Sequence, residues 1–69
     1  MSWMQSVFSS NVSEVGWEEN KLIVVFKNGR RYEYDNVTEE TALRMARAPS
    51  VGEFLNSEIK GQYDYRRIT

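Results

Sequence analysis

The chain has 69 residues and a formal net charge of −1, so we expect one domain with a small core and marginal stability. It has no cysteine and no histidine, which excludes disulfides, thiolate chemistry and the residue that most often acts as general base or metal ligand. Because the net charge is slightly negative, attraction of the whole molecule to phosphate is not expected, and nucleic-acid binding would need a local basic patch.

We do not expect the first ten residues to be a signal peptide. They lack the basic region and the continuous apolar region of a signal peptide, and the longest apolar run of the chain, Leu22 to Phe26, is far shorter than the roughly 18 residues that a membrane helix needs. We therefore expect residues 1–9 to be a loosely ordered leader. We also expect no membrane association and, for a chain without cysteine, a cytoplasmic location.

Three segments with β-strand composition follow, near residues 12–17, 22–27 and 31–36. The second is apolar on both faces, as is typical of the middle strand of a small sheet. Asn28-Gly29, between the second and third segments, is the strongest short signal for a hairpin turn. These features predict a three-stranded antiparallel meander.

Two short helices are predicted after the strands, near residues 38–47 and 51–60. Thr38 and Ser50 are placed to cap them, and Gly61 follows the second helix, where a left-handed cap is needed. The predicted fold class is therefore α+β, in which the meander is followed by the two helices and an ordered C-terminal arm.

The hairpin turn decides which way Tyr32 and Tyr34 point, because a slip of one residue moves every side chain to the other face. A two-residue turn places Tyr32 opposite Val25, whereas a three-residue turn with a bulge at Gly29 places it opposite Val24. Both turns require a positive φ at Gly29. The face of Val24 is the more apolar, so we favour the three-residue turn and core-facing tyrosines. The expected core comprises Val15, Trp17, Leu22, Val24 and Phe26, with Leu55 and Ile59 from the second helix.

An ordered set of short motifs resembles the KTSC domain, a family named for a C-terminal extension of some lysyl-tRNA synthetases and also found as small bacterial and phage proteins. The motifs are Ser13-x-Val15-Gly16-Trp17, Leu22-x-Val24-x-Phe26-x-Asn28-Gly29, Tyr32-x-Tyr34-x-Asn36-Val37, Ala48-x-Ser50-x-Gly52, Phe54 and Ile59-Lys60-x-x-Tyr63-x-Tyr65-Arg66-Arg67. The resemblance implies a single domain over residues 10–68. The chain departs from the family pattern at Thr38, where proline is usual, and at Ala42, where an aromatic residue is usual. The family is uncharacterised, and its attachment to synthetases implies RNA binding.

Cations and aromatic residues alternate near the C-terminus, as they do on surfaces that bind single-stranded nucleic acid. The candidate binding residues are Lys60, Tyr63, Tyr65, Arg66 and Arg67, joined by Arg30 and Arg31 if the hairpin tip lies nearby. In the structural alternative, Tyr63 or Tyr65 closes the core and the arginines pair with surface acids such as Asp64 or Glu58.

Two functions remain open at this point. The first is a small non-enzymatic module that binds RNA or single-stranded nucleic acid, without a metal or cofactor, through the basic and aromatic residues. The second is a protein-interaction accessory domain that uses an apolar patch around Trp3, Phe8, Ile23 and Val25. The two hypotheses differ in whether the cations gather on one face.

Overall fold

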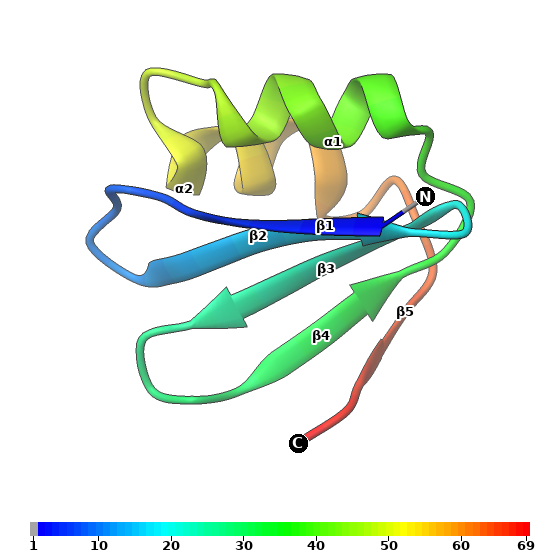
Figure 1. The fold of residues 1–69 in the computed structure, drawn as a ribbon, viewed down its shortest axis with the longest axis horizontal. Coiled ribbons are helices and arrows are strands. Elements are labelled where there is room, and N and C mark those ends of the chain that lie inside the picture. The colour runs from blue at the N-terminus through cyan, green and yellow to red at the C-terminus, as the bar shows by residue number, and fades with distance from the viewer. Residues whose placement is uncertain (1) are drawn as a thin grey trace.

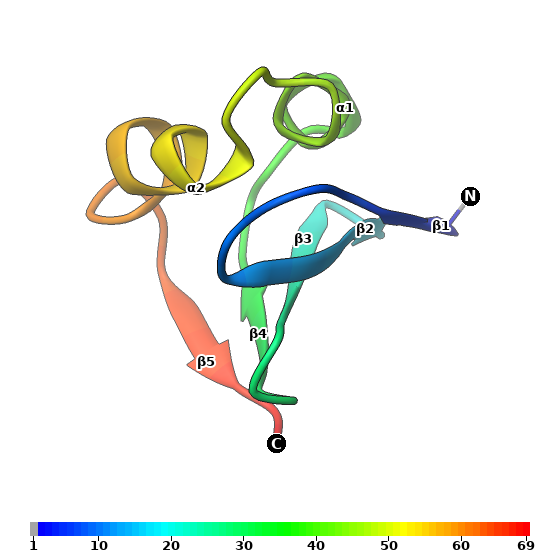
Figure 2. The same ribbon diagram turned by 90° about the vertical axis from the view of Figure 1, so that its left-hand side faces the viewer.

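The computed structural model describes residues 2–69 and has two layers, an antiparallel sheet and a group of helices on one side of it (Figures 1 and 2). The five strands are hydrogen-bonded in the order β1-β2-β3-β4-β5. Their bounds are Ser2–Ser6, Val12–Glu18, Lys21–Phe26, Arg31–Tyr34 and Tyr65–Arg67. The helices, which connect β4 to β5, are α1 (Glu39–Ala46), α2 (Val51–Phe54) and the π-helical segment η1 (Leu55–Ile59).

The hairpin between β2 and β3 has a tight turn, and the predicted register of the hairpin between β3 and β4 is confirmed. Trp17 pairs with Leu22 across a two-residue turn in which Glu19 and Asn20 have φ values of 50° and 64°. The left-handed conformation of both turn residues matches the right-handed twist of the strands.

The second hairpin has the three-residue turn. The Phe26 N–H donates to the Arg30 carbonyl at 2.8 Å, and Gly29, with a φ of 91°, donates to the Phe26 carbonyl at 2.9 Å. This turn places Tyr32 opposite Val24 and Tyr34 opposite Leu22. Both tyrosines therefore lie on the face of the sheet that the core uses.

The helices begin where their caps predict. The Thr38 hydroxyl accepts from the Thr41 N–H, and the Ser50 hydroxyl accepts from the Glu53 N–H, each at 3.3 Å. The second predicted helix starts as the α-helix α2 and ends as the wider π-helix η1. At its end, the Lys60 N–H donates to the Leu55 carbonyl, five residues back, at 2.8 Å. Gly61, with a φ of 81°, then reverses the chain toward β5.

The prediction of only three strands is corrected, because both edge strands were missed. Residues 2–6, which we expected in a loose leader, form β1, and Tyr65–Arg67 of the predicted arm forms β5. A Cβ atom at Gly16 would collide with the Met4 Sδ atom and lie 2.9 Å from the Trp3 carbonyl oxygen, so glycine allows β1 to lie close to β2. The Trp3 Nε1 atom also donates to the Glu39 carboxylate at 3.1 Å, which ties β1 to α1.

The core lies between the sheet and the helices, with α1 packed mainly against β2. Its buried residues are Val12, Val15, Leu22, Val24, Tyr34, Val37, Ala42, Met45, Ala46, Val51, Leu55 and Ile59. Trp17 and Phe26, which we expected in the core, are only half-buried. Phe26 is the last residue of β3, and its ring packs edge-on against Tyr32 and lines an open pocket. Between residues 2 and 69, no helix has the length and apolar character needed to cross a membrane.

Candidate functional site

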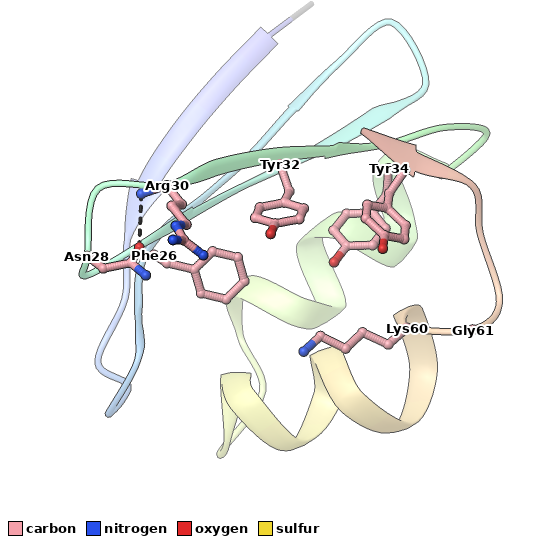
Figure 3. A pocket seen from close by; sticks show the side chains of 8 residues that line it. Phe26, Asn28, Arg30, Tyr32, Tyr34, Lys60 and Gly61 are labelled. Carbon is pink, nitrogen blue, oxygen red and sulfur yellow. Dashed lines mark hydrogen bonds between the residues drawn. The ribbon is translucent and has the colours of Figure 1, made fainter. Parts of the chain in front are cut away.

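A pocket of about 490 Å³ opens on the helix side of the sheet, at the β3–β4–β5 end (Figure 3). Its walls come from the β3–β4 hairpin, the end of η1 and the last strand. The lining residues are Phe26, Asn28, Arg30, Tyr32, Tyr34, Lys60, Gly61 and Tyr65. Segments that are far apart in the sequence therefore meet around one hollow.

Strand pairing explains why the aromatic side chains gather here. Tyr34 lies directly opposite Tyr65 across β4 and β5, and residues that face each other in an antiparallel pair project to the same side of the sheet. The Tyr65 ring centroid is 5.5 Å from that of Tyr34 and 5.7 Å from that of Tyr32, and Phe26 meets Tyr32 edge-on at 5.5 Å. The four rings form one contiguous aromatic cluster.

The rings differ sharply in exposure. Tyr34 is 2% exposed and belongs to the core, whereas Tyr65 is 62% exposed and Tyr32 is half-buried. Burial raises the pKa of Tyr34 above its ordinary value, and the neighbouring Tyr65 and Tyr32 raise it further. Its hydroxyl therefore loses its proton less readily than that of an exposed tyrosine. The hydroxyls of Tyr32 and Tyr34 both point into the hollow, toward the side from which Lys60 extends (Figure 3).

Two cations reach the pocket from different layers. Arg30 follows the hairpin turn, where its N–H donates to the Asn28 Oδ1 atom at 3.0 Å (Figure 3). Lys60 comes from the end of η1, and its side chain extends across the helix side of the hollow, below the rings (Figure 3). None of the described residues that line the pocket is acidic, so the pocket has a local positive charge although the whole chain is slightly negative.

The reverse face of the same strands is different. Arg66 lies opposite Glu33, and its guanidinium is 3.5 Å from the Glu33 carboxylate and 3.6 Å from the Asp35 carboxylate. Arg31 lies on this face as well, opposite Val25. The structure therefore separates these two arginines from the pocket.

The remaining candidates are divided between core and pocket. Tyr63 is half-buried and packs against the core, as the structural alternative predicted for one of the two tyrosines. Arg67 lies opposite Tyr32 and thus on the pocket face, where its Nε atom donates to the main-chain oxygen of Thr69 at 3.0 Å. The pocket-side candidates are Arg30, Lys60, Tyr65 and Arg67.

Sequence reasoning missed part of the pocket. We interpreted Phe26 and Tyr32 as core residues and did not single out Asn28 or Gly61 as lining residues, although they all line the hollow. The bulged turn predicts the position of Tyr32, since that turn places the side chain beside the pocket cations. No equivalent local signal predicts that Phe26 lines the pocket.

The apolar patch proposed as an alternative does not form one surface. Trp3 pairs with Trp17 on the core side, whereas Ile23 lies on the reverse face with Glu33. Of the patch residues, only Phe8 is fully exposed, at 103%. The structure thus distributes these side chains over both faces of the sheet.

The fold and the pocket together define a class of small α+β domain, a five-stranded antiparallel sheet in which the helices precede the last strand. A family model for the KTSC domain matches residues 8–63, so the chain belongs to the KTSC domain family, as its motifs indicated. The two departures from the family pattern both lie at the first helix: Thr38 is its N-cap, and Ala42 lies on its buried face.

A solved relative supports the same conclusion. The crystal structure of a KTSC domain protein from Yersinia pestis is similar over 100% of both chains, with 30% sequence identity and a TM-score of 0.87. Among proteins with curated descriptions, none matches the chain. The comparisons therefore support the family and the fold.

Proposed function

We propose that this domain is a small non-enzymatic module that binds single-stranded nucleic acid, with RNA favoured, on the pocket face of the sheet. The observation that carries the proposal is the composition of the pocket: four aromatic rings and two cations, with no acidic side chain among its described lining residues. Bases stack on exposed aromatic rings, and phosphates are attracted to lysine and arginine.

The position of the charges supports this proposal over general electrostatic attraction. With a net charge of −1, the molecule as a whole does not attract a polyanion. Arg30 and Lys60 are exposed and have no carboxylate among the pocket residues to neutralise them, whereas Arg66 is paired with two acids. Attraction to phosphate is therefore concentrated where the rings lie.

The functional groups of the pocket residues also fit a binding role. Its lining has phenol, guanidinium, amine and amide groups but no carboxylate, and the chain has no histidine or cysteine. A general base poised near neutral pH is therefore not offered by these side chains. We place this activity in the cytoplasm, where a chain without cysteine is at no disadvantage.

The proposal is tested by a two-dimensional NMR titration with a pool of short single-stranded RNAs, at low and moderate salt. We expect the amides of Arg30, Tyr32, Gly61 and Tyr65 to shift, and the shifts to weaken as salt is added. Polyphosphate, which has charge but no bases, is the matched control and should cause smaller shifts at Tyr32 and Tyr65. Single-stranded DNA of the same sequences tests the preference for RNA.

Two results of this titration would contradict the proposal. If the pocket amides do not move with RNA even at low salt, the proposal is wrong and a protein partner becomes the leading hypothesis. Shifts of equal size with RNA and polyphosphate would mean that the rings take no part in binding.

A further inference from the structure

The shape of the pocket suggests how much of a nucleic acid it holds. Its volume is about 490 Å³, within the range of roughly 300–1,000 Å³ that is typical of small-molecule sites. It is bounded by the sheet, by the end of η1 and by the hairpin tip, and all four aromatic rings of the site lie within this one hollow. An extended strand would instead need a groove lined with successive aromatic side chains.

The rings provide one stacking position. Tyr65 is the most exposed of the four pocket rings, at 62%, and it is tilted by 35° to both of its tyrosine neighbours. Tyr34 is buried behind it in the core, so it supports Tyr65 and presents little of its own surface. A single flat base therefore has access to Tyr65 and the adjoining edge of Tyr32.

The cations are placed for an anionic group attached to that base. Arg30 extends from the hairpin and Lys60 from the helix layer, and both border the same hollow as Tyr65 (Figure 3). A phosphate that lies within reach of both would gain two charged contacts, and arginine can donate two parallel hydrogen bonds to it. The hydroxyl of Tyr32, which points inward (Figure 3), is available for the polar edge of the base.

We infer that the pocket is a site for one nucleotide, with the base against Tyr65 and Tyr32 and the phosphate between Arg30 and Lys60; this inference rests on the proposed function. The ligand chemistry is a nucleoside 5′-phosphate unit. It reaches the pocket either as a free mononucleotide or as one splayed nucleotide of a single strand, and the experiment below separates these two sources.

The experiment is an NMR titration of the intact chain with each of the four common ribonucleoside 5′-monophosphates. Nucleosides and ribose 5-phosphate serve as ligands that lack either the phosphate or the base. We expect saturable binding of one mononucleotide per chain, with shifts at Arg30, Tyr32, Gly61 and Tyr65, and weaker binding of both partial ligands. Lys60→Gln and Arg30→Gln should each raise the dissociation constant about threefold to fivefold, as expected for loss of one exposed charge contact.

Arg31→Gln is the matched control, because it removes the same charge one residue from Arg30 but on the reverse face. It should leave the mononucleotide affinity unchanged. Melting curves of all three variants verify that they are folded, which is expected because all three side chains are exposed.

The outcomes distinguish the one-nucleotide inference from the proposed function. If single-stranded RNA shifts the pocket amides and no mononucleotide does, the one-nucleotide inference is overturned and the proposed function stands. If mononucleotides bind and RNA binds no more tightly, the inference holds for a free nucleotide and strand binding is overturned. If neither ligand binds the pocket, both statements are wrong.

Discussion

Cations lie at both faces of β4 and β5, but their environments differ. On the pocket face, Tyr32 and Tyr65 adjoin Arg30 and Lys60, with no acid in the lining. On the reverse face, Arg66 is neutralised by Glu33 and Asp35. A run of cations in a sequence therefore does not identify a binding surface by itself. The alternation of a strand and the acids opposite each cation decide which charges remain available.

Within the pocket, Tyr34 and Tyr65 form a second contrast, since they are neighbours with opposite exposure. Tyr34→Ala removes a buried ring and should lower the free energy of unfolding by about 3–5 kcal/mol. A loss of this size is comparable with the whole stability of so small a domain. Urea denaturation measures this loss. Tyr65→Ala, the matched variant, should cost far less. Equal losses at both positions would contradict the assignment of one ring to the core and the other to the surface.

Tyr65→Ala should instead affect binding. Loss of a stacking ring is expected to weaken binding of single-stranded RNA by about 1–3 kcal/mol for each base that stacks. Fluorescence anisotropy of a labelled RNA measures the affinity, and the salt dependence of binding should change little because no charge is removed. Unchanged affinity in a folded Tyr65→Ala variant would remove this ring from the site.

Gly29 maintains the difference between the faces, because its left-handed conformation belongs to the turn that sets the register. Gly29→Ala should lower stability by about 1 kcal/mol through backbone strain. No atom lies within 4 Å of a Cβ added there, so a steric clash does not contribute. The midpoint of urea denaturation measures the effect. A variant as stable as the parent chain would argue against the positive φ, and with it against the bulged turn.

Alkaline pH gives a smaller and more specific test of the buried ring. The pKa of Tyr34 is raised in the folded state, so above pH 10.0, the ordinary value, the unfolded chain loses this proton while the folded chain retains it. The unfolded state then binds fewer protons, and stability falls as pH rises further. Tyr34→Phe should show a shallower loss of stability between neutral and alkaline pH. The same pH dependence in both proteins would show that Tyr34 does not carry the effect.

The centre of the fold could be predicted because its signals are local. Asn28-Gly29 marked the turn, the apolar face of β3 selected its register, and Thr38 and Ser50 marked the helix starts. β1 could not be found in this way: it is short, mostly exposed, and its position depends on a close approach over Gly16. A glycine within a strand pattern is the one clue, since it often marks close approach of another backbone.

The candidate site could be predicted only in part, for a similar reason. Lys60, Tyr65 and Arg30 were recognised as basic or aromatic residues near a chain end or a turn. Their meeting depends on the pairing of β5 with β4 and on the point where η1 ends, which are tertiary features. Tyr65-Arg66-Arg67 was interpreted as one cluster, but once it is a strand its middle residue must face the other way.

The most direct test of the central claim compares two double variants that each remove two positive charges. One is Arg30→Gln with Lys60→Gln on the pocket face, and the other is Arg31→Gln with Arg66→Gln on the reverse face. The measurement is the dependence of single-stranded RNA affinity on salt, whose logarithmic slope is about −0.7 per phosphate neutralised. We predict that the pocket variant flattens the slope by one to two contacts and that the reverse-face variant leaves it unchanged. Equal flattening in both variants would contradict the account, because binding would then follow net charge rather than the pocket.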